Sequence, residues 1–100
     1  MILSCGEALI DFLQGPVGGQ AGYVPHPGGS PFNVAVGLAR LGVPAGFLGG
    51  VSTDVFGDLL VDALARNGVD RRFAVRLPAP TTRAPARPPA PSWRGTRRRW

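Results

Sequence analysis

Two polar side chains and a pair of glycines lie where a ligand with several hydroxyl groups could be held. Asp11 stands near the end of an apolar run at the start of the chain, and Gly28-Gly29 precede a segment that contains Asn33. A carboxylate and a carboxamide can each form hydrogen bonds with two hydroxyl groups. Paired glycines let the backbone come close to a ligand and let a preceding segment hinge. Singly, these residues fit a solvated strand end, a turn and a polar first-turn residue, so the predicted site depends on their lying together.

Strands and helices alternate along the chain in the order that a parallel sheet requires. The apolar run over residues 1–13, broken by Gly6-Glu7, predicts a strand buried on both faces. The elements predicted after it are a helix over 30–41, a strand over 45–51, a helix over 56–66 and a strand over 73–77. Short links between alternating strands and helices indicate an α/β fold with a doubly wound parallel sheet.

The ends of both helices carry recognisable signals. Ser30 is a suitable N-cap and Pro31 suits the first helical position, while Gly42 is typical of the residue that ends a helix. The second helix begins with Ser52, Thr53 or Asp54 as its cap and ends at Asn67-Gly68. Apolar residues surround most of the first helix, which predicts that it is covered on more than one side.

Ligands of such a sheet bind outside the carboxyl ends of its strands, beside helix N-termini. Asp11 and the Gly28-Gly29 pair are both predicted at this edge. Residues 13–27 between them are rich in glycine and contain Gly18-Gly19, which predicts a small β-ribbon without a core of its own. The sequence therefore predicts a site at the edge of the sheet with a ribbon beside it.

Composition restricts the class of protein. The 100 residues suffice for one small domain or part of a larger one. No apolar stretch is long enough for a membrane span, and the start does not resemble a secretory signal. One cysteine allows no internal disulfide, so we expect a cytoplasmic location.

The positive charge is confined to the end of the chain. Residues 1–80 carry five Arg against six acidic residues, whereas residues 81–100 carry six Arg and no acid. Six prolines lie between positions 78 and 91, which disfavours a helix or a central strand there. We predict a disordered tail over 83–100. Its Arg and Trp residues could bind nucleic acid, but we favour a shifted reading frame as its origin.

Three segments resemble the ribokinase/PfkB family of sugar kinases. Residues 28–42 are similar to its amino-terminal signature, and Gly6-Glu7-Ala8-Leu9-Ile10-Asp11 is similar to the first strand of its fructokinase-like branch. Residues 49–58 resemble its Gly-Asp-Asp segment, although Ser52 and Thr53 depart from that pattern. The resemblance covers about residues 2–82 and implies a ribokinase-like α/β fold, present here as an amino-terminal part.

The resemblance also implies a function. The family transfers a phosphoryl group from ATP to a sugar hydroxyl, with Mg²⁺ balancing the phosphate charge. On this basis Asp11, Gly28, Gly29 and Asn33 bind the sugar, and the ribbon over 13–27 is a lid. The family's Gly-Ala-Gly-Asp motif does not occur in the 100 residues. We therefore expect no catalytic, ATP-binding or metal-binding residue here and an inactive chain. A homodimer is possible in full-length relatives.

Two other functions stay open at the level of the sequence. One is a non-catalytic module that binds a sugar, and the other is a nucleic-acid binder that uses the Arg and Trp residues of the tail. We expect a small-molecule sugar as the partner and neither a membrane nor nucleic acid.

Overall fold

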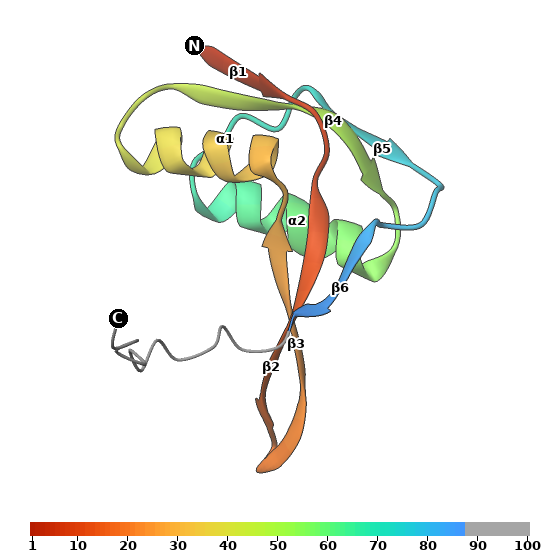
Figure 1. The fold of residues 1–100 in the computed structure, drawn as a ribbon. Coiled ribbons are helices and arrows are strands. Elements are labelled where there is room, and N and C mark those ends of the chain that lie inside the picture. Colours follow the sequence, from red (N-terminus) through yellow and green to blue (C-terminus); the bar gives the residue numbers. More distant parts are fainter. Residues whose placement is uncertain (88–100) are drawn as a thin grey trace, which may run out of the picture.

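Two three-stranded sheets and two helices make up residues 1–87, which are the residues that the computed structural model describes (Figure 1). The first sheet is parallel, with strand order β1 (Ile2–Cys5), β4 (Ala45–Ser52), β5 (Ala74–Leu77). The second has the order β3 (Gln20–Gly28), β2 (Leu9–Val17), β6 (Arg83–Arg87). The helices are α1 (Ser30–Arg40) and α2 (Val55–Arg66). The predicted α/β class is confirmed.

The core lies between the parallel sheet and the two helices. Phe47 and Val51 of β4 are fully buried, together with Leu60 and Leu64 of α2. The ring of Phe47 meets the ring of Phe32 from α1 edge to face, with the ring centres 6.0 Å apart. Strand β4 is central in its sheet, so its apolar side chains join both helices into one core.

The opposite face of the parallel sheet is exposed. Side chains on neighbouring parallel strands share a face when they are in register. Leu3 and Leu48 are each 38% exposed, and Val75 of β5 is 54% exposed. The prediction that the first strand is buried on both faces is therefore wrong for the described residues, because α1 and α2 pack against one face of this sheet.

The apolar run at the start of the chain forms two strands instead of one. Strand β1 ends at Cys5, and β2 begins at Leu9 in the other sheet. The chain between them turns at Gly6, whose φ is +146°. Such a backbone angle directs β2 out of the parallel sheet, so Asp11 is the third residue of β2 and does not lie at the carboxyl end of a parallel strand.

Strands β2 and β3 form the predicted ribbon. They pair in antiparallel register from Leu9 opposite Gly28 to Val17 opposite Gln20. Gly18 and Gly19 make the turn with φ of +57° and +81°, the two positive angles that a tight hairpin turn needs. The ribbon is longer than predicted, since it begins at Leu9 instead of residue 13. In Figure 1 it extends away from the helices.

The predicted helix ends are confirmed except at the start of α1. Gly29, and not Ser30, is the N-cap, and the backbone N–H of Asn33 donates to the Gly29 carbonyl. The second helix is capped by Asp54, one of the three predicted candidates. The first helix was predicted to be covered on more than one side, but its outer side is open, since Val34 is 51% exposed. Neither helix is long and apolar enough to span a membrane within residues 1–87.

Strand β6 corrects the prediction that residues 83–100 form a disordered tail. Residues 83–87 pair in parallel with β2, with Ile10 opposite Arg83 and Asp11 opposite Ala84. Proline is tolerated here because β6 is an edge strand, where a missing N–H removes no central ladder bond. Of the residues predicted to contact nucleic acid, Arg83 and Arg87 lie in β6, whereas both Trp residues and the other Arg residues of the tail lie outside the described residues.

Candidate functional site

A cavity of about 410 Å³ lies between the root of the ribbon and the start of α1. Asp11, Gly29 and Asn33, three of the four residues predicted to bind a ligand, line this cavity. Its volume falls within the range of about 300–1,000 Å³ that is usual for small-molecule sites. The structure thus brings three of the four predicted residues to one cavity, which Asp11 reaches from the ribbon.

The fourth predicted residue, Gly28, makes room for the Asp11 carboxylate. A Cβ atom placed on Gly28 would be 2.5 Å from Oδ2 of Asp11, closer than non-bonded atoms can approach. Gly28 is buried, and the Asp11 side chain is half-buried above it. Gly28 therefore leaves room for the Asp11 side chain without lining the cavity itself.

Gly29 and Asn33 form the opposite wall at the first turn of α1. Gly29 has φ of +99°, and a Cβ atom there would lie 2.7 Å from the Glu7 carbonyl oxygen. The backbone can make this close approach because glycine has no side chain. The turn that follows exposes the Asn33 side chain at the cavity. An acceptor-only carboxylate thus stands across from a carboxamide that both donates and accepts.

Five further lining residues were not predicted as ligand contacts: Leu9, Phe12, Leu13, Ser30 and Ala84. Leu9 precedes Asp11 on β2, Ser30 follows Gly29, and Ala84 comes from β6. The sequence predicts Ser30 as the N-cap of α1. Because Gly29 is the N-cap instead, the Ser30 side chain does not cap the helix and lines the cavity. No chemical signal in an alanine could have identified Ala84, which arrives through strand pairing. His26 pairs opposite Asp11 in the ribbon register and is exposed.

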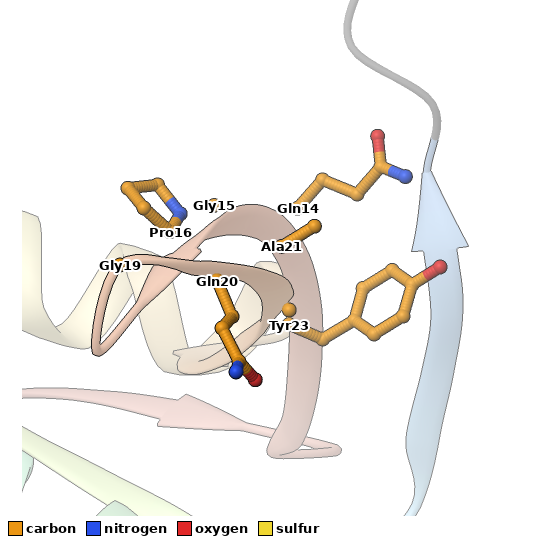
Figure 2. Close-up of a pocket in the computed structure, with 8 residues that line it drawn as sticks. Gln14, Gly15, Pro16, Gly19, Gln20, Ala21 and Tyr23 are labelled. Atoms are coloured by element: carbon orange, nitrogen blue, oxygen red, sulfur yellow. The ribbon is translucent and has the colours of Figure 1, made fainter.

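A larger depression of about 650 Å³ lies at the tip of the ribbon (Figure 2). Figure 2 shows Gln14 and Tyr23 on paired positions of β2 and β3, with Gln20 near the turn. Neither Asp11 nor Asn33 lines it, and its lining contains no carboxylate or basic side chain. The curl of a two-stranded hairpin creates this hollow, so we place the candidate site at the smaller cavity, where polar groups converge.

Two carboxylates outside the cavity are held in their charged form by hydrogen bonds. The hydroxyl and backbone N–H of Thr81, followed by the backbone N–H of Gly57, hold the pKa of Asp54 far below its ordinary value of 3.8. The guanidinium and backbone N–H of Arg72 lower the pKa of Asp70 in the same way. Hydrogen bonds to the ionised form favour that form over the protonated one.

We predict that the chain loses stability in acid through these two groups. A carboxyl with a lowered folded-state pKa takes up its proton more readily when the chain is unfolded. Its contribution is complete above the unfolded pKa near 3.8 and declines as the pH falls below it. Urea titrations between pH 7 and pH 3, followed by circular dichroism, should show this decline. The decline should be smaller in Asp54→Asn, and an unchanged slope in that variant would contradict the assignment.

Comparison with known proteins shows which family the chain resembles. The model for "pfkB family carbohydrate kinase" matches residues 1–84. A fructokinase from Rhizobium leguminosarum bv. trifolii is 42% identical over 83 residues, which are 82% of this chain and 26% of the relative. A 5-dehydro-2-deoxygluconokinase from Clostridium perfringens is 41% identical over 73 residues, or 69% of this chain and 22% of the relative.

Solved structures give the same result. Fructokinase from Xylella fastidiosa matches with a TM-score of 0.74 and 43% identity, over 81% of this chain and 27% of that one. Aminoimidazole riboside kinase from Salmonella enterica, solved with aminoimidazole riboside and an ATP analogue, matches with a TM-score of 0.72 and 31% identity, over 82% and 27%. The chain thus spans about a quarter of the length of these relatives. Since the family model covers most of its residues, the chain belongs to the pfkB family of carbohydrate kinases.

Proposed function

We propose that this chain forms the sugar-binding rim of a kinase that transfers a phosphoryl group from ATP to a sugar hydroxyl. One observation carries the proposal: Asp11, Gly29 and Asn33 line a single cavity, with Gly28 giving the Asp11 carboxylate its place. The names of the relatives support it, since they include fructokinases and a 5-dehydro-2-deoxygluconokinase. The fructokinase-like start of the sequence favours a fructose-like substrate.

Each wall of the cavity has a role in this proposal. The Asp11 carboxylate accepts hydrogen bonds from sugar hydroxyls, and the Asn33 carboxamide donates one and accepts another. The backbone at Gly28-Gly29 lets the sugar approach closely. The β2–β3 ribbon acts as a lid that covers the sugar and excludes water, as phosphoryl transfer requires.

ATP and Mg²⁺ are proposed for the whole kinase and not for this chain. A fructokinase from Xylella fastidiosa has been solved with bound ATP. Within residues 1–87, however, no three His, Cys, Asp or Glu side chains come together as a metal site. Since Mg²⁺ is usually held by one or two carboxylates together with the phosphates of a nucleotide, we propose that its site lies with the ATP site in the rest of the kinase, and we derive no step through it. The 100 residues also lack Gly-Ala-Gly-Asp, so we propose that the chain alone transfers no phosphate.

Calorimetric titration of the full chain with fructose, ribose and 2-keto-3-deoxygluconate tests the proposal. We expect saturable binding of at least one sugar, with fructose the strongest. Incubation with that sugar and Mg-ATP should release no ADP above the rate without sugar. Absence of binding by all three sugars would contradict the proposed rim, and sugar-dependent ADP release would contradict the proposed inactivity.

Replacing Gly28, which leaves room for Asp11, should weaken fructose binding without lowering the stability of the chain. In Gly28→Ala, the new methyl group displaces the Asp11 carboxylate, which is the end of a flexible side chain and can move away. We expect fructose binding to weaken about tenfold, the effect of one lost hydrogen bond to a charged group. The melting temperature should change little. The matched control is Gly37→Ala in α1, where a Cβ atom meets nothing within 4 Å and binding should be unaffected. Equal binding by the two variants would contradict the role of Gly28.

A further inference from the structure

Asp54 does more than cap α2. Its Oδ1 accepts a hydrogen bond of 2.7 Å from the Gly57 backbone N–H, which is the cap itself. The same oxygen accepts one of 2.6 Å from the Thr81 hydroxyl, and Oδ2 accepts one of 2.9 Å from the Thr81 backbone N–H. The two residues are 27 positions apart, and Thr81 is only 7% exposed. Asp54 and Thr81 therefore tie the start of α2 to the segment that leads into β6, and we call this pair the clasp.

The segment held by the clasp joins directly to the strand that carries Asp11. The carbonyl of Thr82 accepts a hydrogen bond of 3.0 Å from the backbone N–H of Ile10. Strand β6 then pairs with β2 so that Ala84 lies opposite Asp11. Both Ala84 and Asp11 line the candidate cavity. A short chain of backbone contacts thus connects Asp54 to the cavity wall.

The first turn of α2 also contacts β2 through side chains. Phe56, two residues after Asp54, meets the ring of Phe12 edge to face with the ring centres 5.6 Å apart. The guanidinium of Arg83, on β6, lies over the ring of the same Phe56, 5.8 Å from its centre. Phe12 is the neighbour of Asp11 on β2 and lines the same cavity. The start of α2 therefore contacts both β2, which carries Asp11, and β6, which pairs with it.

We propose that Asp54 and Thr81 position Asp11 for sugar binding by holding β6 against β2, an inference that rests on the proposed function. Neither residue lines the cavity. They act through the pairing of Ile10 with Thr82 and of Asp11 with Ala84. Without the clasp, β6 is a five-residue edge strand with a register shift between Asp11 and Leu13, held only by its pairing with β2 and by the contact of Arg83 with Phe56. Asp54 and Thr81 are thus positioning residues.

Two variants of the full chain separate the clasp from the helix cap. Asp54→Ser keeps a good N-cap but removes the second oxygen that Thr81 needs. Thr81→Val removes the hydroxyl and leaves Asp54 in place. In both we expect faster amide hydrogen exchange at Ile10, because the segment that carries its partner Thr82 is held less firmly. The increase should be about tenfold in Asp54→Ser and smaller in Thr81→Val, where the backbone N–H of Thr81 still donates to Asp54. We also expect fructose binding to weaken about tenfold, while α2 stays helical by circular dichroism.

Internal references distinguish the clasp from a general loss of stability. The backbone N–H of Phe47, in the parallel sheet, donates to the backbone carbonyl of Asp70 and not to β6, so its exchange should remain unchanged. Thr81→Ser keeps the hydroxyl and should behave like the native chain. Asp62→Ser removes an exposed carboxylate from α2 and should also leave exchange at Ile10 and fructose binding as in the native chain. If Asp54→Ser fails to fold, Thr81→Val carries the comparison.

The two proposals fail in different ways. Native exchange at Ile10 in both Asp54→Ser and Thr81→Val would overturn the clasp, whatever the sugar measurement shows. Faster exchange at Ile10 with unchanged fructose binding would show that the clasp holds β6 but does not position Asp11, which also overturns the inference. Lack of fructose binding by the native chain would instead contradict the proposed function.

Discussion

Replacing Asp11 with alanine should weaken fructose binding by the full chain about 100-fold. The Asp11 carboxylate is the charged acceptor of the candidate cavity, which Asn33 also lines, and the absence of a side chain at Gly28 leaves room for this carboxylate. A hydrogen bond to a charged group contributes about 1.5–3 kcal/mol, and each 1.4 kcal/mol is about tenfold in affinity. A carboxylate that holds two hydroxyls therefore accounts for a loss of at least this size.

The comparison that makes this result specific uses three other variants. Asp11→Asn keeps the shape and one acceptor oxygen, so its binding should fall between the native chain and Asp11→Ala. Asn33→Ala should lose about tenfold, since it removes a neutral partner. Asp62→Ala removes an exposed carboxylate from α2, far from the cavity lining, and should bind as the native chain does. Equal affinities for Asp11→Ala and Asp62→Ala, measured by calorimetry, would contradict the assigned site.

The second large effect concerns the core. Phe47→Ala should destabilise the chain by about 3–5 kcal/mol, because it removes a fully buried ring and leaves a cavity between β4 and α1. Small domains unfold with a total of about 5–15 kcal/mol, so this loss removes a large share of the stability of the chain. Urea titration followed by circular dichroism should show a midpoint far below that of the native chain.

The neighbouring residue is the matched control. Leu48 follows Phe47 on the same strand but lies on the opposite face, where it is 38% exposed. Leu48→Ala should cost much less than Phe47→Ala, because an exposed side chain leaves no enclosed cavity. Similar midpoints for the two variants would mean that the helices do not pack on the Phe47 face of the sheet.

Much of the fold could be predicted because its signals are local. Gly42 ends α1, Asp54 caps α2, and Gly18-Gly19 turns the ribbon, each as expected from neighbouring residues alone. A cap or a turn depends on a few consecutive residues, and their types, such as Gly where φ is positive, can be read from the sequence. The alternation of apolar strands and amphipathic helices then indicated the α/β class.

The parts that could not be predicted depend on contacts between distant segments. Residues 1–13 form one apolar run, and nothing in that run shows that Gly6 sends β2 into a second sheet. Residues 83–87, which include Pro85, lack strand propensity and form β6 because β2 offers an unpaired edge. The same reason explains the candidate site: Asp11, Gly28, Gly29 and Asn33 were indicated by chemistry and resemblance, whereas Ala84 reached the cavity through β6.

Amide-resolved nuclear magnetic resonance during a fructose titration of the full chain tests the sugar-binding rim most directly. We predict that the resonances of Asp11, Gly29, Asn33 and Ala84 shift along one saturating curve, since these residues line the same cavity. The resonances of Gln14, Gln20 and Tyr23 at the ribbon tip should shift only together with these, because the ribbon is the proposed lid and its larger hollow is not the proposed sugar site. Shifts confined to the ribbon tip, or no shifts at saturating fructose, would contradict the claim that this cavity binds a sugar.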